Sequence, residues 1–301
     1  MNLVAAAKSH SYRIICGSKK DRDSTAGVLS FSINGEQKAI SLNIKQLSHR
    51  LIENLPDVSA DLVEIASYVY ATDAAISRGG PVDSRMGELW RRNFSFEIPV
   101  RCLELWNRHD IKHKLEETLS LLSDDFYEFT FISQDAEENI DQFFDFGKES
   151  SWQPDSVVMF SGGLDSFAGA VEELIERDNR VALISHHSST KIGKVQTDLA
   201  RELVRRVGDG KLQHIPITAQ LKSGSNNEGT HRTRSFLFAS LGMATAQLFG
   251  KAQVSFYENG VISLNLPPVA QVIGARATRT THPRTLNSFS KLFSVCAAVQ
   301  N

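Results

Sequence analysis

The sequence predicts an α/β protein in two parts: an N-terminal α+β domain over residues 1–150, and a doubly wound parallel sheet over residues 151–301. Two observations predict this class. Strand and helix patterns alternate from residue 157 onward, as in βαβ units with right-handed crossovers. An acidic stretch, residues 133–154, separates this pattern from the first 150 residues, and we interpret it as a linker that contains the domain boundary. A length of 301 residues suits two domains of ordinary size.

The N-terminal part begins with β structure and continues with helices. Asn34-Gly35 lies between two alternating apolar runs and predicts the two-residue turn of a β-hairpin. Ser59 or Asp61 is expected to cap the second helix. The apolar spacings predict strands over 12–16, 28–33, 39–44, 94–98 and 126–132, and helices over 47–55, 59–70 and 111–122.

Two arginines stand at the start of the strand over 94–98. Arg91 and Arg92 follow Trp90, so they could contact nucleic acid through charge and stacking. Two solvated arginines at a strand start are the interpretation that the pattern favours. A partner nucleic acid therefore stays an open question at the level of the sequence.

The C-terminal part alternates strands with helices. Its strands are predicted over 157–160, 180–185, 214–218 and 253–257, and its helices over 167–177, 193–207, 232–249 and 284–300. In the helix over 193–207 the residues expected to face inward are Val195, Leu199, Leu203 and Val207. The last helix carries an apolar face of Leu286, Phe289, Leu292, Phe293 and Cys296. We expect this face to be covered by a partner, by a second copy or, as the favoured interpretation, by chain beyond a cut at Asn301.

The turn at residues 161–166 has the pattern of an anion-binding loop. Ser161, Gly162, Gly163, Leu164, Asp165 and Ser166 follow a short apolar strand and precede an amphipathic helix. The first N–H groups of a helix lack partners and carry partial positive charge, so this geometry binds phosphate. Neither the Gly-Lys-Ser/Thr ending of a kinase-type P-loop nor the three spaced glycines of a dinucleotide fingerprint is present.

Composition limits the other classes of function. The net charge of −2 gives no global argument for binding nucleic acid or a membrane surface, and no run of about 20 apolar residues predicts a membrane span. Three dispersed cysteines and the lack of a signal-peptide pattern predict a cytoplasmic protein without a zinc site.

The string Ser-Gly-Gly-Leu-Asp-Ser resembles the pyrophosphate loop, or PP-loop, of the N-type ATP pyrophosphatases. That resemblance implies a PP-loop (adenine nucleotide alpha hydrolase-like) fold, with ATP and Mg²⁺ as cofactors. It also implies that ATP is cleaved to AMP and pyrophosphate, AMP being transferred to a substrate oxygen while the loop holds pyrophosphate.

A second segment narrows the resemblance. Thr230-His-Arg-Thr-Arg-Ser-Phe-Leu-Phe238 is similar to the arginine-containing helix start of the 7-cyano-7-deazaguanine synthases (QueC). Those synthases carry four zinc cysteines and lack a long leader, whereas a leader before a QueC-like domain is similar to QatC, the QueC-like component of the Qat anti-phage defence system. The resemblance, over about residues 155–295, implies a 7-deazaguanine-type small-molecule substrate and protein partners from the same defence operon.

Site residues follow from the topology and from the resemblance together. Ligands of open α/β sheets bind beyond the carboxyl ends of the strands, where four predicted loops meet. Asp165, Ser161 and Arg234 are the expected catalytic residues. The nucleotide is expected to contact residues 161–166 together with His186, Ser188 and Arg232, and the substrate is expected to contact Glu258, Asn259, Gly260 and Arg276.

Several roles stay open at this stage. Asp165 could orient the loop amides, as in an Asx turn, or approach Mg²⁺. Arg232 and Arg234 are two residues apart and should point in different directions. Arg276 belongs to a basic cluster that could hold an acidic substrate or be a solvated loop.

Three classes of function fit the sequence. The first is a QueC-like ligase that adenylates a carboxylate of a 7-deazaguanine. The others are another PP-loop enzyme, such as a tRNA-modifying or amide-forming synthetase, and a nucleotide-binding component without turnover.

Overall fold

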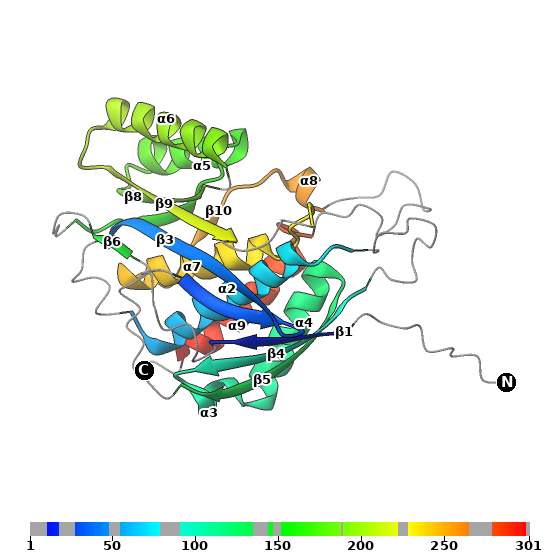
Figure 1. Ribbon diagram of the computed structural model, residues 1–301. Coiled ribbons are helices and arrows are strands. Elements are labelled where there is room, and N and C mark those ends of the chain that lie inside the picture. Colours follow the sequence, from blue (N-terminus) through cyan, green and yellow to red (C-terminus); the bar gives the residue numbers. More distant parts are fainter. Residues whose placement is uncertain are drawn as a thin grey trace.

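The strands of this protein join in one large sheet (Figure 1). The computed structural model describes residues 11–17, 28–47, 55–78, 91–134, 144–146, 152–187, 189–221, 228–264 and 279–298. Within them, the strand order is β10-β7-β8-β9-β3-β2-β1-β4-β5, with β6 paired to β3, and most pairings are parallel. The predicted α/β class is confirmed. No helix of the described residues is long and apolar enough to cross a membrane.

The elements alternate along most of the chain. The strands are β1 (Ser11–Cys16), β2 (Val28–Ile33), β3 (Glu36–Leu47), β4 (Asn93–Val100), β5 (Phe126–Ser133), β6 (Phe144–Phe146), β7 (Ser156–Met159), β8 (Val181–His186), β9 (Leu212–Leu221) and β10 (Ser255–Phe256). The helices are α2 (Asp57–Ala75), α3 (Leu103–Trp106), α4 (His109–Ser123), α5 (Leu164–Val171), the π-helical turn η4 (Glu172–Glu176), α6 (Thr190–Val207), α7 (Arg234–Leu248), α8 (Gly260–Leu264) and α9 (Pro283–Ala298).

The predicted hairpin between β2 and β3 is confirmed. Its two turn residues, Asn34 and Gly35, both have positive φ, at 49° and 88°, as a turn matched to the twist of a hairpin requires. The helix expected over 47–55 is wrong at its start, because Leu47 ends β3; residues 48–54 lie outside the described part of the chain.

The expected cap of α2 is also wrong. This helix begins at Asp57 after Pro56, which places Ser59 and Asp61 inside it. Asp61 is buried, and its Oδ2 accepts a hydrogen bond of 3.0 Å from Trp106 Nε1, so this carboxylate joins α2 to α3.

Strands from both predicted parts belong to the same sheet. β3 pairs antiparallel with β9, from Ile40 opposite Leu221 to Ile44 opposite Ile217. The hydrogen-bonding edge of β9 is therefore occupied by a strand from the first 50 residues. The division into domains at residue 150 stays a prediction, and any boundary there would divide this sheet.

Helices cover both faces of the sheet around β7, β8 and β9. Figure 1 shows α5 and α6 on one side, with α7 and α2 on the other. Successive residues of β7, and Phe160 directly after it, alternate between two cores: Val157 and Met159 pack with α7, while Val158 and Phe160 pack with α5 and α6. This burial on both faces explains the continuous apolar run in the sequence.

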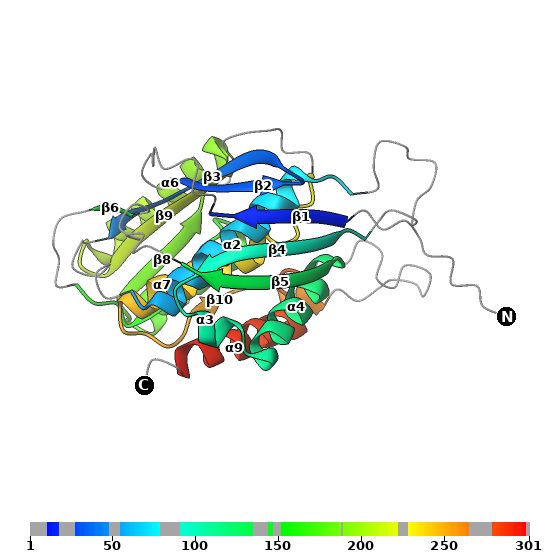
Figure 2. The same ribbon diagram turned by 60° about the horizontal axis from the view of Figure 1, so that its bottom comes forward.

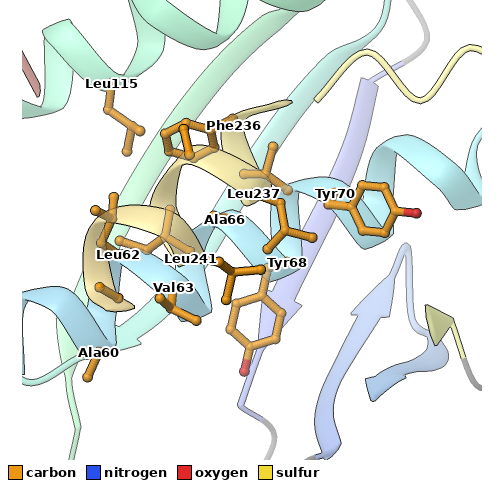
Figure 3. Packing of buried hydrophobic residues seen from close by; sticks show 14 of the residues in the cluster. Ala60, Leu62, Val63, Ala66, Tyr68, Tyr70, Leu115, Phe236, Leu237 and Leu241 are labelled. Atoms are coloured by element: carbon orange, nitrogen blue, oxygen red, sulfur yellow. The ribbon is translucent and has the colours of Figure 1, made fainter. Parts of the chain in front are cut away.

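The helices α2 and α7 form the centre of the main core. In Figure 3, Ala60, Leu62, Val63 and Ala66 of α2 lie against Phe236, Leu237 and Leu241 of α7, with Leu115 of α4 nearby. Both helices are buried over most of their length, since each also packs on the sheet.

The apolar face of α9 is covered by this chain itself. Phe289, Leu292, Phe293 and Cys296 are buried in the main core, and α9 lies along α4 (Figure 2). The rings of Phe236 and Phe289 are 5.8 Å apart. The expectation that this face needs another chain or a further segment is therefore wrong. The helical spacing identified the face correctly but could not show that α4 and α7 pack on it.

Arg92 is not solvated, contrary to the favoured interpretation. Its side chain is 1% exposed and pairs with Asp73 at the end of α2 and with Asp125, the latter at 2.7 Å. Arg78 donates two hydrogen bonds to the same Asp125, at 2.9 and 2.6 Å. Arg91 is exposed and pairs with Asp124 at 3.0 Å. Arg92 therefore belongs to a buried ionic cluster, Asp73–Arg78–Arg92–Asp125, and is unavailable to nucleic acid.

Candidate functional site

A pocket of about 220 Å³ lies at the carboxyl ends of β7, β8 and β10. Ligands of open α/β sheets bind at this edge. Four of the predicted site residues line the pocket: Ser161, His186, Arg234 and Glu258. They come from four separate places in the chain, so the convergence expected from topology is present. The other lining residues are Met159, Ile192, Gln196, Ser235, Phe238, Phe256, Thr280 and Thr281.

The turn after β7 is shaped by a glycine. Gly162 has φ of 79°, in the region that other residues rarely adopt. A Cβ atom at this position would also lie 2.8 Å from Cγ of Gln196. Gly162 is therefore required both for the backbone conformation and for the close approach of α6.

The two loop serines hold the turn together and do not cap α5. Ser161 Oγ accepts a hydrogen bond of 3.2 Å from the N–H of Gly163 and lies 2.9 Å from Ser166 Oγ. Ser166 Oγ in turn donates to the carbonyl of Gly163 at 3.1 Å. α5 follows Gly163 without a side-chain cap, so the N–H groups of its first turn remain available to an anion.

Leu164 and Asp165 are exposed at the start of α5. Among the described residues, the Asp165 side chain has no hydrogen-bond partner, so it does not orient the loop amides as an Asx turn would. The other role considered for Asp165, an approach to Mg²⁺, stays a prediction.

Gln196 is a site residue that the sequence analysis missed. It lies on the buried face of α6 with Gly193, Ala200 and Leu203, whereas Val195, which was expected to face inward, is exposed. The small residues on this face let α6 approach the loop. The sequence offered one signal for Gln196: it follows Gly193 by three residues, so the two share a face of the helix, and a glycine on that face permits close packing.

The amide of Gln196 connects three segments of the site. Its Nε2 donates to the carbonyl of Ser161 at 2.9 Å, and it lies 3.4 Å from the carbonyls of Phe160 and His186. One side chain thus holds the loop and the end of β8 in fixed relation to α6.

His186 ends β8 and is buried. Its pKa is lowered from 6.5 to about 4, mainly by burial and to a lesser extent by the positive charge of the Arg234 guanidinium. The rings of Tyr70 from α2 and Phe238 from α7 lie 6.3 and 5.6 Å from the imidazole. The neutral ring is therefore held between aromatic side chains from the two central helices.

Arg234 is the first residue of α7 and lines the pocket, whereas Arg232 points elsewhere. Arg232 donates to the carbonyl of Ser123 at 3.3 Å, so the two arginines diverge as their spacing predicts. Thr233, between them, is held by Asp73, whose Oδ2 accepts from its N–H at 3.0 Å and from its hydroxyl at 2.9 Å. The buried ionic cluster therefore anchors the helix start that presents Arg234.

Glu258 follows β10 and lines the pocket. The pKa of its carboxyl group is raised, mainly by burial and to a lesser extent by the negative charge of Asp165. Tyr257 holds this segment against α5, because its hydroxyl donates to Glu173 at 2.6 Å and its ring lies over Gly169. Tyr257 thereby connects α5 with Glu258.

Asn259 and Gly260 form the N-terminal end of α8 in this structure. Asn259 Oδ1 accepts from the N–H groups of Val261 and Ile262, at 3.0 and 3.1 Å, as a helix cap does, and Gly260 begins the helix. Ser188 and Arg276 lie outside the described residues. The hydroxyls of Ser235, Thr280 and Thr281 were not predicted from the sequence, which carries no marker for them.

Metal ligands are sparse in the described part of the chain. It contains no group of three or more His, Cys, Asp or Glu side chains that could hold a metal ion. The three cysteines have free thiols. That the protein binds no zinc stays a prediction.

Comparisons of this chain with protein-family models, with curated proteins and with solved structures found no match. The loop motif and the residues that line the pocket are therefore the features of this chain that bear on its function.

Proposed function

We propose that this chain is a QueC-like PP-loop enzyme, an ATP-dependent ligase that adenylates a carboxylate of a 7-deazaguanine-type substrate. The observation that carries the proposal is the placement of Ser161, His186, Arg234 and Glu258 around one pocket, beside the open N-terminus of α5. The motif supplies the resemblance, and the pocket supplies a place where a nucleotide and a second substrate could meet.

The reaction has one bond-forming and one bond-breaking step. A carboxylate oxygen of the substrate attacks the α-phosphorus of ATP, and the bond from that phosphorus to the oxygen bridging to the β-phosphate breaks. The acyl-adenylate forms and pyrophosphate leaves. The N–H groups at the start of α5 would hold the leaving pyrophosphate, and Arg234 would stabilise charge on the α-phosphoryl group as a fork donor.

Mg²⁺ fits the donor set at this edge. Proteins usually bind the ion through one or two carboxylates together with phosphate and water oxygens. Asp165 is exposed at the start of α5, beside the N–H groups that would hold pyrophosphate, so its carboxylate is the one available on the phosphate side. When bound, the ion would neutralise charge on the phosphates. Asp165 would then contribute by holding it at the loop.

Glu258 is the candidate contact for the second substrate. A carboxylate accepts hydrogen bonds from the ring N–H and amino group of a 7-deazaguanine. The identity of the acceptor that finally receives the acyl group stays open, as do the contributions proposed for Asn259, Gly260 and Arg276.

The biological setting of the proposal comes from the resemblance alone. A QueC-like domain behind a long N-terminal segment is similar to the QueC-like component of the Qat anti-phage defence system. Protein partners from the same operon are part of this proposal.

Product analysis tests the proposed reaction. Purified chain is incubated with ATP, Mg²⁺ and 7-carboxy-7-deazaguanine, and nucleotides are separated by anion exchange. We expect AMP and pyrophosphate, lost in Asp165→Ala and kept in Asp198→Ala, a control on the exposed face of α6. Both variants should unfold at nearly the wild-type temperature. ADP and phosphate as the sole products would refute an AMP-forming mechanism.

A further inference from the structure

Three arginines gather at the carboxyl end of α4, outside the pocket. Arg91 Nη2 lies 3.0 Å from Oδ1 of Asp124, and Arg279 Nη1 lies 3.8 Å from the same oxygen. Arg279 also donates to a carbonyl of the last turn of α4 at 2.8 Å, and Arg232 donates to another at 3.3 Å. The three come from separate segments of the chain, so the fold brings them together. We call them the arginine patch.

Positive charge is in excess at this patch. Asp124 Oδ1 is shared between two guanidinium groups, so one negative charge faces two positive ones. The pKa of Arg232 is lowered, mainly by burial and to a lesser extent by the positive charges of Arg78 and Arg279. Positive charge therefore outweighs the nearby carboxylates at the third arginine as well. A surface of this kind attracts anions.

The patch presents arginine to solvent. The side chain of Arg91 is 56% exposed and that of Arg279 is 28% exposed. Arg284 is exposed in the first turn of α9, the helix that lies along α4 (Figure 2). A guanidinium group has five N–H donors in a planar fork, and such forks bind phosphate oxygens in pairs. Phosphate groups are therefore the anions that fit this surface best.

An exposed aromatic ring borders the patch. Phe126 begins β5 and is 53% exposed, and Cζ of Arg91 lies 5.5 Å from the centre of its ring. Proteins bind single-stranded nucleic acids by stacking bases on aromatic rings beside basic side chains that contact the phosphates. A phosphorylated peptide would account for the arginines but not for the exposed ring. Glu128, the next residue on this face of β5, is acidic, so the basic surface extends from Phe126 toward Arg279 and not along the strand.

We propose that the arginine patch and Phe126 bind single-stranded nucleic acid, with the arginines on its phosphates and the ring stacked on a base. The proposal goes beyond the proposed ligase reaction and does not rest on it. Arg279 directly precedes Thr280 and Thr281, which line the pocket, so the surface borders the pocket without being part of it.

Fluorescence anisotropy with the full chain tests the proposal. The probes are a labelled oligothymidylate of about 12 nucleotides and an abasic deoxyribose-phosphate oligomer of equal length, in about 50 to 200 mM salt. The variants are Arg91→Ala, Arg279→Ala and Phe126→Leu. Arg108→Ala is the matched control: Arg108 is 52% exposed and pairs with Asp110 at 2.8 Å, at the other end of α4.

We expect wild type to bind oligothymidylate about tenfold more tightly than the abasic oligomer. With three phosphates contacted, the logarithm of the association constant should fall with the logarithm of salt concentration at a slope of about −2. Arg91→Ala and Arg279→Ala should each weaken both probes and reduce the slope by about 0.7. Phe126→Leu should abolish the preference for bases and keep the slope, while Arg108→Ala changes neither.

Three results would overturn the proposal: no binding of oligothymidylate at about 50 mM salt, equal affinity of wild type for the two probes, or the same loss in Arg108→Ala as in Arg91→Ala. Arg234→Ala tests for binding in the pocket. Loss of oligothymidylate there, with wild-type binding in Arg91→Ala, would also overturn the proposal. Thermal unfolding verifies that each variant is folded, and Arg91→Ala, in an exposed ion pair, decides the test if Arg279→Ala unfolds.

None of these measurements includes ATP. Failure of the proposed ligase reaction would therefore leave the result for nucleic acid intact, and a chain that forms AMP and pyrophosphate without binding oligothymidylate would refute this inference alone.

Discussion

Replacing Gly169 with alanine tests how Tyr257 fixes Glu258 beside α5. A Cβ atom at Gly169 would lie 2.0 Å from Cγ of Tyr257, 2.3 Å from Cδ2 and 2.5 Å from Cβ. These atoms are at the base of the side chain, so a small rotation cannot remove the overlap. The ring must leave α5, and its hydroxyl then loses the hydrogen bond to Glu173.

The expected cost follows from opposing contributions. Overpacking costs about 1–3 kcal/mol, or the chain avoids it by giving up a hydrogen bond to a charged group, which is worth about 1.5–3 kcal/mol. Alanine is favoured over glycine inside a helix by about 1 kcal/mol. We therefore expect Gly169→Ala to lower the free energy of unfolding by up to about 2 kcal/mol.

Urea unfolding in two backgrounds separates these contributions. In a Tyr257→Gly background the overlapping atoms are absent, so Gly169→Ala should instead stabilise the fold by up to about 1 kcal/mol. Gly210→Ala is the control, because a Cβ there meets nothing within 4 Å. If Gly169→Ala has the same effect in both backgrounds, the packing of Tyr257 on α5 is wrong.

Two further predictions concern buried charge. Asp73→Asn removes a buried charge from between Arg78 and Arg92, so it should lower the free energy of unfolding by about 3–5 kcal/mol, as measured in urea. Asp110→Asn, in an exposed pair with Arg108, is the control and should change it much less. Equal losses would contradict the burial of the cluster. Burial lowers the pKa of His186 and His214 from 6.5 to about 4. Between pH 6.5 and 4 the unfolded chain therefore binds more protons than the folded chain. The free energy of unfolding should fall, as the pH falls, by up to about 1.4 kcal/mol per pH unit for each histidine. Thermal melts from pH 7 to 4 should show a shallower fall in His186→Phe, and an unchanged slope would refute the neutral buried imidazole.

Local patterns predicted much of the site. The apolar run before Ser161 and the glycines after it predict a strand, a turn and a helix N-terminus, because each step depends on neighbouring residues only. The position of His186, Arg234 and Glu258 at one edge followed from topology, since parallel strands end on the same side. The hairpin at Asn34-Gly35 was predictable for the same reason.

What the sequence could not show depends on contacts between distant segments. Arg92 looks like a surface residue until Asp73 and Asp125 are brought beside it by α2 and β5. Gln196 looks like an ordinary polar helix residue until α6 approaches the loop closely enough for its amide to reach three carbonyls. Neither pattern has a local periodicity, because the partner residues are 10 to 36 positions away in the sequence.

The N-terminal half takes part in building the pocket through three separate contacts. β3 occupies the edge of β9, so the sheet that carries His186 continues into the first 50 residues. Tyr70 of α2 packs against the ring of His186, and Asp73 of the same helix holds Thr233 next to Arg234. Since α2 and α7 share the main core, a change in α2 that shifts its last two turns must also move the start of α7. The geometry of both Arg234 and His186 therefore depends on residues that precede the loop motif by about 90 positions, which a search for motifs alone would leave out of the site.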